Sequence, residues 1–389
     1  MSVQRIVIVA GETSGDNLAA GLILALRERR PQLQFEGVAG PAMTAAGCVA
    51  WASSEQLSVM GLFEVVRHLP ALLGLRRRLR ERVLADPPLA YIGVDAPEFN
   101  LGLAAQLHER GVPTVQYVSP QVWAWRQGRV RRMARTLDLV LCLLPFEKRF
   151  YDGRGLLAEF VGHPLADRIP LLPDRAAARA RLGVDPAATL VALLPGSRRG
   201  EVERLARDFI AAAAWLARAR PGVRFVAPMA NAAARSVFVA AIKRQRRDGG
   251  LPQIELLDGE SQEAITAADC VLVASGTATL ETLLCKRPMV VAYRVSTATH
   301  KLVQWFGLMK APFFSHPNLL AGRVVVPELL QDAVTPERLG RELLDWLEDP
   351  QRVAAAEAEF ARIHLQLRQG ASGRAAEAVL ALLDRRGAA

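Results

Sequence analysis

The chain has 389 residues, of which 51% are hydrophobic, and its formal net charge is +10. This length exceeds what one core comfortably holds, so we expect two domains, and the hydrophobic content excludes a disordered protein. The excess of Lys and Arg indicates an anionic partner: a nucleic acid, a membrane surface or a phosphorylated substrate. Four cysteines without CxxC spacing and six histidines without HExxH spacing argue against a disulfide framework or a structural metal site.

A short β-branched run over residues 5–10 opens the chain, and a glycine loop and an amphipathic stretch follow it. This order predicts a strand, a loop and a helix, the first unit of a parallel α/β sheet. Open α/β sheets bind ligands at the carboxyl ends of their strands, where this loop is expected. Further strands, mostly with helices between them, are expected at residues 34–38, 89–94, 114–117, 137–143 and 159–161. The first half is therefore predicted to be a doubly wound α/β domain.

A proline-rich segment at residues 162–173 predicts a connection between domains. Strands and helices then alternate again, with strands expected at residues 190–194, 224–227, 254–257, 270–274 and 289–293. The pattern predicts domains at residues 1–170 and 171–335 and a helical tail at 336–389. The sequence does not decide where that tail packs.

Two glycine turns in the second half each follow a buried strand and open a helix. They contain Gly196, Ser197 and Arg198, and Ser275, Gly276 and Thr277. Unpaired N–H groups at a helix N-terminus suit a phosphate, and two such turns at adjacent strand ends suit a diphosphate. Arg198 or Arg199 can add a guanidinium, and Glu281, one turn into the second helix, can accept a hydrogen bond from a ribose. Neither turn has a Walker A or Rossmann fingerprint, and the plainer alternative is two ordinary capped helix starts.

Asp95 follows a buried strand, at the edge of the sheet where active sites form. A carboxylate there can act as a general base and take a proton from an attacking hydroxyl. The alternative is a turn-forming residue before Ala-Pro. The position of Asp95 at a strand end favours the role of general base.

Trp123 and Trp125 lie on a loop expected after a strand. They are candidates for a platform under a sugar or an acyl group, or for simple loop packing. Aromatic residues among basic ones also occur in RNA-binding proteins, but the chain has no RNP-type motif.

An apolar stretch followed by arginines spans residues 60–82. An apolar face beside a cluster of arginines favours attachment to an anionic membrane surface. The commoner alternative is a core-facing helix with a solvated basic side. The candidate membrane-contact residues are Val65, Val66, Leu69, Leu72, Leu73, Arg76 and Arg77. No stretch reaches the roughly eighteen apolar residues that a spanning helix needs.

Taken together, these motifs resemble those of the lipid-A-disaccharide synthases, which are glycosyltransferases with the GT-B fold. The resemblance covers residues 9 to 323 in the family's order. Its most specific stretches are Gly11-Glu-Thr-Ser-Gly-Asp16, Gly93-Val-Asp-Ala-Pro-Glu-Phe-Asn100, Leu194-Pro-Gly-Ser-Arg198, Ser275-Gly-Thr-Ala-Thr-Leu-Glu281 and Pro317-Asn-Leu-Leu-Ala-Gly-Arg323. Pro164 and His316 stand where other residues are expected to be common in the family.

The resemblance implies two Rossmann-like domains that face a cleft, and an inverting transfer. Such an enzyme joins UDP-2,3-diacylglucosamine to 2,3-diacylglucosamine 1-phosphate (lipid X), giving a β-1′,6-linked tetraacyl disaccharide 1-phosphate and UDP. Inversion in a single displacement requires one general base and stabilisation of the leaving group.

The resemblance also implies roles for the candidate residues. Asp95 is the base on the acceptor 6-hydroxyl. Gly196, Ser197 and Arg198 hold the UDP diphosphate, aided by Ser275, Gly276 and Thr277. Glu281 holds the ribose and Asn318 faces the nucleotide. The acceptor side of the cleft is expected to be lined by Glu12, Ser14, Gly15 and Asp16.

The expected partners are the two acylated sugars and the cytoplasmic face of the inner membrane, where the protein is peripheral. No metal, cofactor or nucleic acid is expected, and a homo-oligomer is possible. The nearest alternatives are another UDP-sugar enzyme of the GT-B fold, such as a muramyl-pathway transferase or a UDP-N-acetylglucosamine 2-epimerase, and a basic nucleotide- or RNA-binding module.

Overall fold

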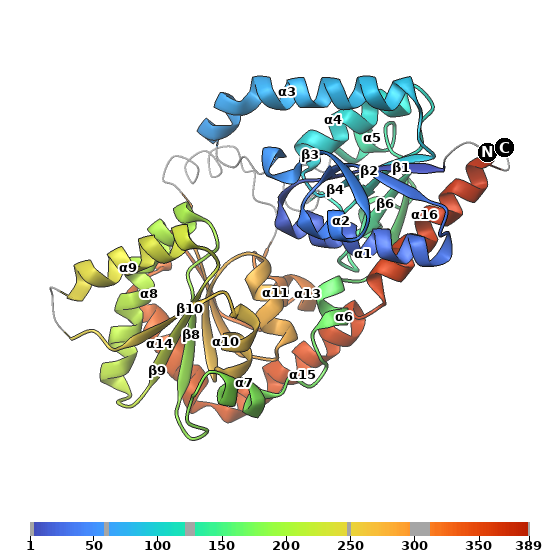
Figure 1. Ribbon diagram of the computed structural model, residues 1–389. Coiled ribbons are helices and arrows are strands. Elements are labelled where there is room, and N and C mark those ends of the chain that lie inside the picture. Colours follow the sequence, from blue (N-terminus) through green and yellow to red (C-terminus); the bar gives the residue numbers. More distant parts are fainter. Residues whose placement is uncertain (1–3, 58–61, 121–128, 247–249, 296–311, 388–389) are drawn as a thin grey trace. The chain divides into compact units, whose positions relative to one another are not determined.

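The computed structural model describes residues 4–57, 62–120, 129–246, 250–295 and 312–387, and for residues 62–68 it describes the backbone alone. The chain divides into two compact units (Figure 1). Unit 1 contains residues 1–167 and 367–389, and unit 2 contains residues 168–366.

Unit 1 is built on a parallel sheet of seven strands in the order β3-β2-β1-β4-β5-β6-β7. The strands are β1 (Arg5–Ala10), β2 (Gln34–Ala39), β3 (Cys48–Ser53), β4 (Ala90–Val94), β5 (Thr114–Tyr117), β6 (Leu139–Cys142) and β7 (Leu157–Phe160). The helices are α1 (Glu12–Arg29), α2 (Pro41–Ala45), α3 (Leu62–Ala85), α4 (Pro97–His108), α5 (Arg129–Met133), α6 (Pro164–Arg168) and α16 (Ala371–Gly387). The prediction missed β3, whose residues are mostly exposed or half-buried and lack a β-branched run.

Alternate residues of β1 enter the two cores of unit 1. Ile6 and Ile8 pack among buried residues of α1 and α16. Val7 and Val9 pack among buried residues of α3 and α4 on the opposite face. Successive side chains of a strand point to opposite faces, so a sheet that is covered on both sides needs a continuous apolar run.

Unit 2 is built on a parallel sheet of six strands in the order β10-β9-β8-β11-β12-β13. The strands are β8 (Leu190–Leu194), β9 (Arg224–Met229), β10 (Ile254–Asp258), β11 (Cys270–Ala274), β12 (Met289–Tyr293) and β13 (Glu328–Leu330). The helices are α7 (Arg175–Arg181), α8 (Arg199–Ala219), α9 (Ala232–Arg246), α10 (Ser261–Ala267), α11 (Thr277–Leu284), α13 (His316–Ala321), α14 (Pro336–Glu348) and α15 (Pro350–Leu367).

The helical tail is shared between the two units. Helix α14 packs on α8 in unit 2, where Gly340 leaves room for the ring of Trp215: an added Cβ would lie 2.4 Å from Cε3. Helix α16 packs on α1 in unit 1. Asp167 accepts hydrogen bonds from the backbone N–H groups of Gly370 (2.9 Å) and Ala371 (2.6 Å), which fixes the start of α16.

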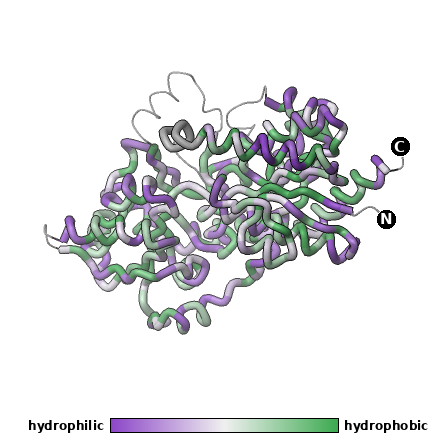
Figure 2. Tube along the Cα trace, turned by 45° about the horizontal axis from the view of Figure 1, so that its top comes forward, coloured by the Kyte–Doolittle hydropathy of each residue, from purple (hydrophilic) through white to green (hydrophobic). Residues whose placement is uncertain are grey.

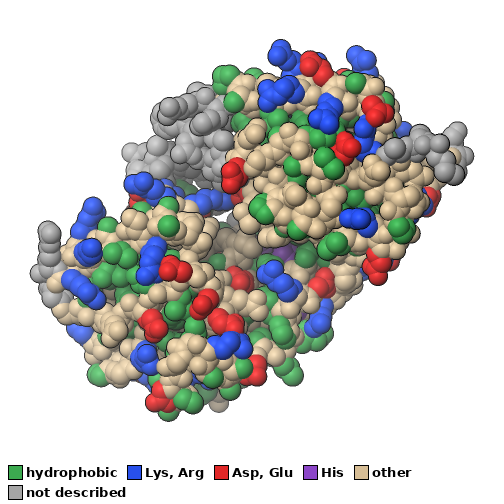
Figure 3. Space-filling model, viewed as in Figure 1, with side chains coloured by type: hydrophobic (Ala, Val, Ile, Leu, Met, Phe, Trp, Pro, Cys, Tyr) green, Lys and Arg blue, Asp and Glu red, His purple; other side chains and the backbone are tan. Residues whose placement is uncertain are grey.

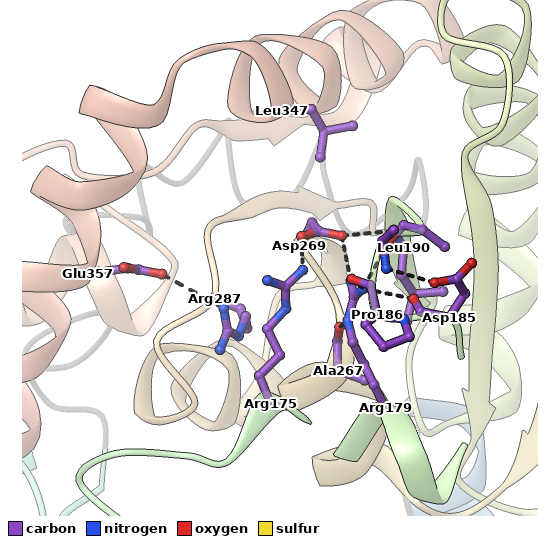
Figure 4. A network of polar contacts seen from close by, with 12 residues as sticks. Arg175, Arg179, Asp185, Pro186, Leu190, Ala267, Asp269, Arg287, Leu347 and Glu357 are labelled. Carbon is purple, nitrogen blue, oxygen red and sulfur yellow. Dashed lines mark hydrogen bonds and ion pairs between the residues drawn. The ribbon is translucent and has the colours of Figure 1, made fainter. Parts of the chain in front are cut away.

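A polar network around Asp269 joins α7 to the start of β8 and β11 (Figure 4). The Asp269 carboxylate accepts hydrogen bonds from Arg175, from Arg179 Nη2 at 2.8 Å and from the Leu190 N–H at 2.8 Å. Arg179 also donates to carbonyl groups of the loop before β8. This network lies at the amino ends of the strands, so it stabilises the edge opposite to the glycine turns.

Both sheets reverse their strand order at one point. In unit 1 the chain moves from β1 to β2 in one direction and reaches β4 on the other side of β1. In unit 2 the corresponding pair is β8 and β11. Ligands of open α/β sheets bind outside the carboxyl ends of strands at such a reversal. The two candidate sites are therefore sought at these two points.

Candidate functional site

The reversal point of unit 1 brings together Gly11 and the first turns of α1, which follow β1, and Asp95 after β4. Ala10 pairs with Val94 at the ends of the two strands. An added Cβ on Gly15 would lie 3.7 Å from Asp95 Cβ, and one on Gly11 would lie 3.0 Å from Ala96 Cβ. The two segments that were predicted separately from the sequence therefore lie side by side.

Asp95 is held in an uncommon backbone conformation. Its φ is +52° and that of Ala96 is +39°, so two consecutive residues other than glycine are left-handed. Such a conformation costs free energy and persists where the surroundings impose it. The Asp95 carbonyl accepts hydrogen bonds from Asn100 Nδ2 at 2.9 Å and from Gln116 Nε2 at 3.1 Å.

Asn100 is itself fixed by a buried contact. It is fully buried, and its Oδ1 accepts a hydrogen bond of 2.8 Å from the Tyr91 hydroxyl. Gly93 makes room for it, because an added Cβ there would lie 2.7 Å from Asn100 Cβ. Sequence reasoning missed the supporting roles of Tyr91 and Gln116. The available signal was Asn100 itself, a polar residue in the first turn of a helix that follows the strand end.

The glycine loop expected after β1 is replaced by helix from Glu12 onward, and the other candidates, which lie on this helix, differ in exposure. Ser14 is exposed and Glu12, with a φ of +52°, is half-buried. Asp16 is only 2% exposed. Its carboxylate accepts hydrogen bonds from the N–H groups of Gly40 and Ala42, both at 2.8 Å, and from that of Met43 at 3.1 Å. Asp16 therefore fixes the start of α2 and does not line a ligand site, which corrects the role expected for it.

The two glycine turns of unit 2 lie on neighbouring strands. β8 pairs with β11 up to Leu194 and Val273, so residues 195–198 and 275–277 follow adjacent strand ends. Gly276 is exposed, and an added Cβ there would meet no atom within 4 Å. Ser197 and Thr277 are exposed as well. This edge of the sheet is therefore accessible and rich in N–H groups of helix starts.

The two arginines near the first turn, Arg198 and Arg199, have different positions and different carboxylate partners. Arg199 lies on the first turn of α8, where its Nε donates to Glu203 Oε1 at 2.8 Å. Arg198 precedes the helix and lies beside the turn, where its Nη1 is 3.3 Å from Glu201 Oε1. Arg198 is therefore the better placed of the two for a diphosphate at the turn.

The second turn is held by residues that the sequence did not single out. The Ser275 hydroxyl donates to the Phe314 carbonyl at 2.9 Å, and the residue at the N-cap of α11 is Gly276. The Thr279 hydroxyl donates to the Gly276 carbonyl at 2.8 Å and lies 2.9 Å from His316 Nδ1. Burial lowers the pKa of His316 to about 4, so its ring is neutral at pH 7.

Glu281 is half-buried on α11, and its Oε2 accepts a hydrogen bond of 3.0 Å from the Ser261 hydroxyl. Burial raises the pKa of its carboxyl group above the ordinary value.

Asn318 is not placed to face a nucleotide. It is 1% exposed, its Nδ2 donates to the Val326 carbonyl at 2.9 Å, and its Oδ1 accepts from the N–H groups of Val325 (2.7 Å) and Val326 (3.0 Å). These bonds tie α13 to the segment before β13. The structure therefore gives Asn318 a structural role in place of the expected contact.

The candidate membrane segment forms helix α3, which packs on α4. Leu69 and Leu73 are 46% and 45% exposed, and Arg77 is exposed four residues further along the same face. Leu72 is half-buried. Arg76 packs against α4, since an added Cβ on Gly102 would lie 2.3 Å from its Nη1.

Hydrophobic and hydrophilic residues alternate along the described part of α3 (Figure 2), and basic side chains are spread over both units (Figure 3). Among the described residues, no helix is both long and apolar enough to cross a bilayer. Within the same residues, no group of three or more His, Cys, Asp or Glu side chains is arranged to hold a metal ion.

Some predicted features lie outside the described residues. These are the two tryptophans at positions 123 and 125 and the side chains of Val65 and Val66.

Comparisons with solved structures bear on the fold. An Anabaena protein crystallised with UDP and glucose is 15% identical, with a TM-score of 0.56, over 97% of this chain and 99% of that one. The UDP-GlcNAc 2-epimerase of Neisseria meningitidis, bound to UDP-GlcNAc, is 11% identical, with a TM-score of 0.64, over 98% and 100% of the chains. The calicheamicin glycosyltransferase CalG4 has a TM-score of 0.61 at 15% identity, over 99% of both chains. The chain thus has the two-domain α/β fold of the GT-B glycosyltransferases.

Comparisons of sequence bear on the family. The model of the lipid-A-disaccharide synthetase family matches residues 6–382. The lipid-A-disaccharide synthase of Pseudomonas aeruginosa is 52% identical over 98% of this chain and 99% of its own length. That of Xanthomonas campestris is 49% identical over 99% of this chain and 88% of its own length. The chain therefore belongs to the lipid-A-disaccharide synthetase family of glycosyltransferases.

Proposed function

We propose that the protein transfers 2,3-diacylglucosamine from UDP to the 6-hydroxyl of 2,3-diacylglucosamine 1-phosphate. The products are the β-1′,6-linked tetraacyl disaccharide 1-phosphate and UDP. Family membership over nearly the whole chain supports the reaction. The observation that carries the residue assignment is the position of Asp95 at the reversal point of the first sheet, in a backbone conformation that its neighbours impose.

In the proposed reaction, Asp95 takes the proton of the acceptor 6-hydroxyl while that oxygen forms a bond to the anomeric carbon of the donor. The bond from the anomeric carbon to the β-phosphate oxygen breaks, and the electron pair leaves with UDP. Attack on the face opposite to the leaving group converts an α-linked donor into a β-linked product. No covalent enzyme intermediate is needed.

The leaving diphosphate gains negative charge in this step. We assign its stabilisation to the N–H groups at the starts of α8 and α11 and to Arg198, since preorganised donors are effective where charge develops. Glu281 is assigned to the ribose. These groups supply the positive charge that a metal ion supplies in other transferases, so we propose a reaction without a metal or cofactor.

Both substrates carry acyl chains, and we propose that the protein takes them from the cytoplasmic face of the inner membrane. The exposed residues Leu69, Leu73 and Arg77 support this, because an apolar pair beside a cation suits an anionic bilayer surface. The protein is then peripheral at that surface.

The test is incubation of the purified protein with UDP-2,3-diacylglucosamine and lipid X. We expect the tetraacyl disaccharide 1-phosphate and UDP in equal amounts, by mass spectrometry and by a UDP assay, with unchanged rates in EDTA. UDP-GlcNAc without acyl chains is the matched control donor. Failure to form the disaccharide, or epimerisation of UDP-GlcNAc, would contradict the proposal, and loss of activity in EDTA would contradict its metal-free form.

A further inference from the structure

The N–H groups of the first glycine turn are occupied by a carboxylate of the protein itself. Glu201 Oε2 accepts hydrogen bonds from the backbone N–H groups of Ser197 and Arg198, both at 3.3 Å. Its Oε1 lies 3.3 Å from Arg198 Nη1. These are the same donors that the proposed function assigns to the diphosphate of the donor sugar.

Gly196 makes room for this carboxylate. Its φ is +123°, and an added Cβ would lie 2.8 Å from Glu201 Oε2 and 2.7 Å from Glu201 Cβ. The glycine turn is thus shaped around the side chain of Glu201. A phosphate group and this carboxylate cannot accept hydrogen bonds from the same N–H groups at once.

The contacts of Glu201 are long for their kind. Hydrogen bonds in which the donor or the acceptor is charged usually measure about 2.7–2.9 Å, and shorter ones are stronger. The three contacts of Glu201 are all 3.3 Å. A diphosphate carries more negative charge than one carboxylate and can therefore displace it.

The displaced side chain has other partners nearby. Arg204 lies three residues after Glu201 on the same face of α8. Its guanidinium lies next to Gly200, where an added Cβ would be 3.3 Å from Arg204 Nη1. Its Nε donates to the Arg294 carbonyl at 3.0 Å, which fixes it beside the turn. Burial raises the pKa of Tyr293 most, Glu201 raises it further, and Arg204 lowers it, so all three groups lie within electrostatic range.

We propose that Glu201 is an internal anion, which occupies the diphosphate-binding turn until the nucleotide arrives and then moves to Arg204. Glu201 thereby lowers the affinity of the turn for nucleoside diphosphates and favours release of UDP after the reaction. This inference rests on the proposed function, because it concerns the same diphosphate site. The alternative is a capping box, in which Glu201 serves only to hold the start of α8.

The test compares Glu201→Gln with Glu203→Gln by isothermal titration with UDP at low salt. Glu201→Gln keeps an oxygen acceptor for the turn but removes its charge. Glu203 is the matched control, because it lies on the same helix and pairs with Arg199 instead of the turn. We expect Glu201→Gln to bind UDP about three- to tenfold more tightly than wild type, and Glu203→Gln to bind within about twofold of it.

A second pair of variants tests the destination of the carboxylate. Arg204→Ala should weaken UDP binding in wild type, because the displaced Glu201 loses its partner, and should have little effect in Glu201→Gln. Equal weakening in both backgrounds would show that Arg204 binds the diphosphate directly and would overturn the proposed movement. If Glu201→Gln does not fold, Glu201→Asp is titrated with UDP instead. Its shorter carboxylate reaches the turn less well, so it should also bind UDP more tightly than wild type.

The outcomes separate the two proposals. Wild-type protein that binds no UDP would overturn the proposed function and this inference with it. Wild-type binding, together with a Glu201→Gln affinity no higher than that of Glu203→Gln, would overturn the inference alone and leave Glu201 as a helix cap.

Discussion

Three polar residues are at most 2% exposed and are hydrogen-bonded to backbone groups of nearby segments. They are Asn100, Asp16 and Asn318. A buried polar group costs free energy unless it is hydrogen-bonded, so such residues fix the segments that they contact. Asn100 acts on the catalytic candidate, because it holds the carbonyl of Asp95. Asp16 fixes the start of α2, and Asn318 fixes the segment before β13. At the residue scale, burial therefore separates positioning groups from groups that can reach a ligand.

The role of Asp95 predicts a loss of turnover without a loss of donor binding. Asp95→Asn keeps the size of the side chain but cannot take a proton. General bases contribute about 10²- to 10⁴-fold, so kcat should fall by that factor while the Kd for UDP stays unchanged. Glu98→Gln is the matched control, since this nearby exposed carboxylate pairs with Arg129. Near-normal kcat in Asp95→Asn would remove Asp95 from the base role.

His316 predicts a pH dependence of stability. Its pKa is lowered by burial from 6.5 to about 4, so the unfolded chain takes up a proton at a higher pH than the folded one. The stability that this group contributes is therefore present above pH 6.5 and is lost as pH falls towards about 4.

His316→Asn retains a donor for Thr279 but cannot titrate. Its unfolding temperature should fall less steeply than that of wild type as pH is lowered through this window, as measured by calorimetry. Glu281 and Asp208, whose pKa values are raised by burial, act in the opposite direction but are present in both proteins. Parallel curves for the two proteins would refute the assignment.

At the scale of elements, α3 divides its residues between the core and the outside. Leu75, Leu79 and Val83 are buried against the sheet and α4, whereas Leu69 and Leu73 are exposed near the other end. A helix that served only the core would not need the exposed pair. Of the leucines that the sequence predicted to face out, Leu69 and Leu73 are exposed and Leu72 is half-buried.

The exposed pair predicts binding to anionic vesicles. Leu69→Ser with Leu73→Ser should lower the partition coefficient by about a hundredfold or more, because each buried leucine contributes roughly 1.5–3 kcal/mol. Leu172→Ser is the matched control, since Leu172 is 90% exposed in unit 2. Co-sedimentation with phosphatidylglycerol vesicles measures the difference. Equal loss of binding in the control, or none in the double variant, would argue against α3 as the membrane contact.

At the scale of the whole molecule, unit 1 is completed by a segment distant in sequence, whereas unit 2 is continuous from residue 168 to 366. Unit 1 needs α16, which returns from residue 371 to pack on α1. Arg29 of α1 pairs with Glu377 of α16 at 2.9 Å. Asp167, the last residue of the first segment of unit 1, holds the start of α16. The C-terminal helix is thereby part of the first folding unit.

Asp167→Ala should therefore loosen α16 without loosening unit 2. Loss of an N-terminal cap costs about 1 kcal/mol, so amide exchange in α16 should rise several-fold. Asp174→Ala is the matched control, because Asp174 caps α7 of unit 2 through the Ala177 N–H at 2.9 Å. Hydrogen–deuterium exchange should show faster exchange in α16 for the first variant and in α7 for the second. Unchanged exchange in α16 would show that its packing on α1 suffices.

The sequence predicted most of the sheet strands, because a strand buried on both faces must be a continuous apolar run, as at residues 190–194 and 270–274. It missed β3 and β13, which are short or largely exposed and lack such a run. It also located the polar loops after strands, including Asp95 and the two glycine turns, since composition changes sharply where a strand ends.

The sequence alone established which residue types follow which strands. It also established the family to which the chain belongs. Only the tertiary structure decided which of those residues remain available for a ligand. Asp16 and the Ser275 hydroxyl are bonded to backbone groups of segments distant in sequence, and Asn318 is bonded to those of the next loop. Glu201 occupies the turn that a phosphate would need. Burial and contacts such as those of Asp16 and Ser275 arise from packing between segments, which no local pattern encodes, whereas the contacts of Glu201 are local to the start of α8.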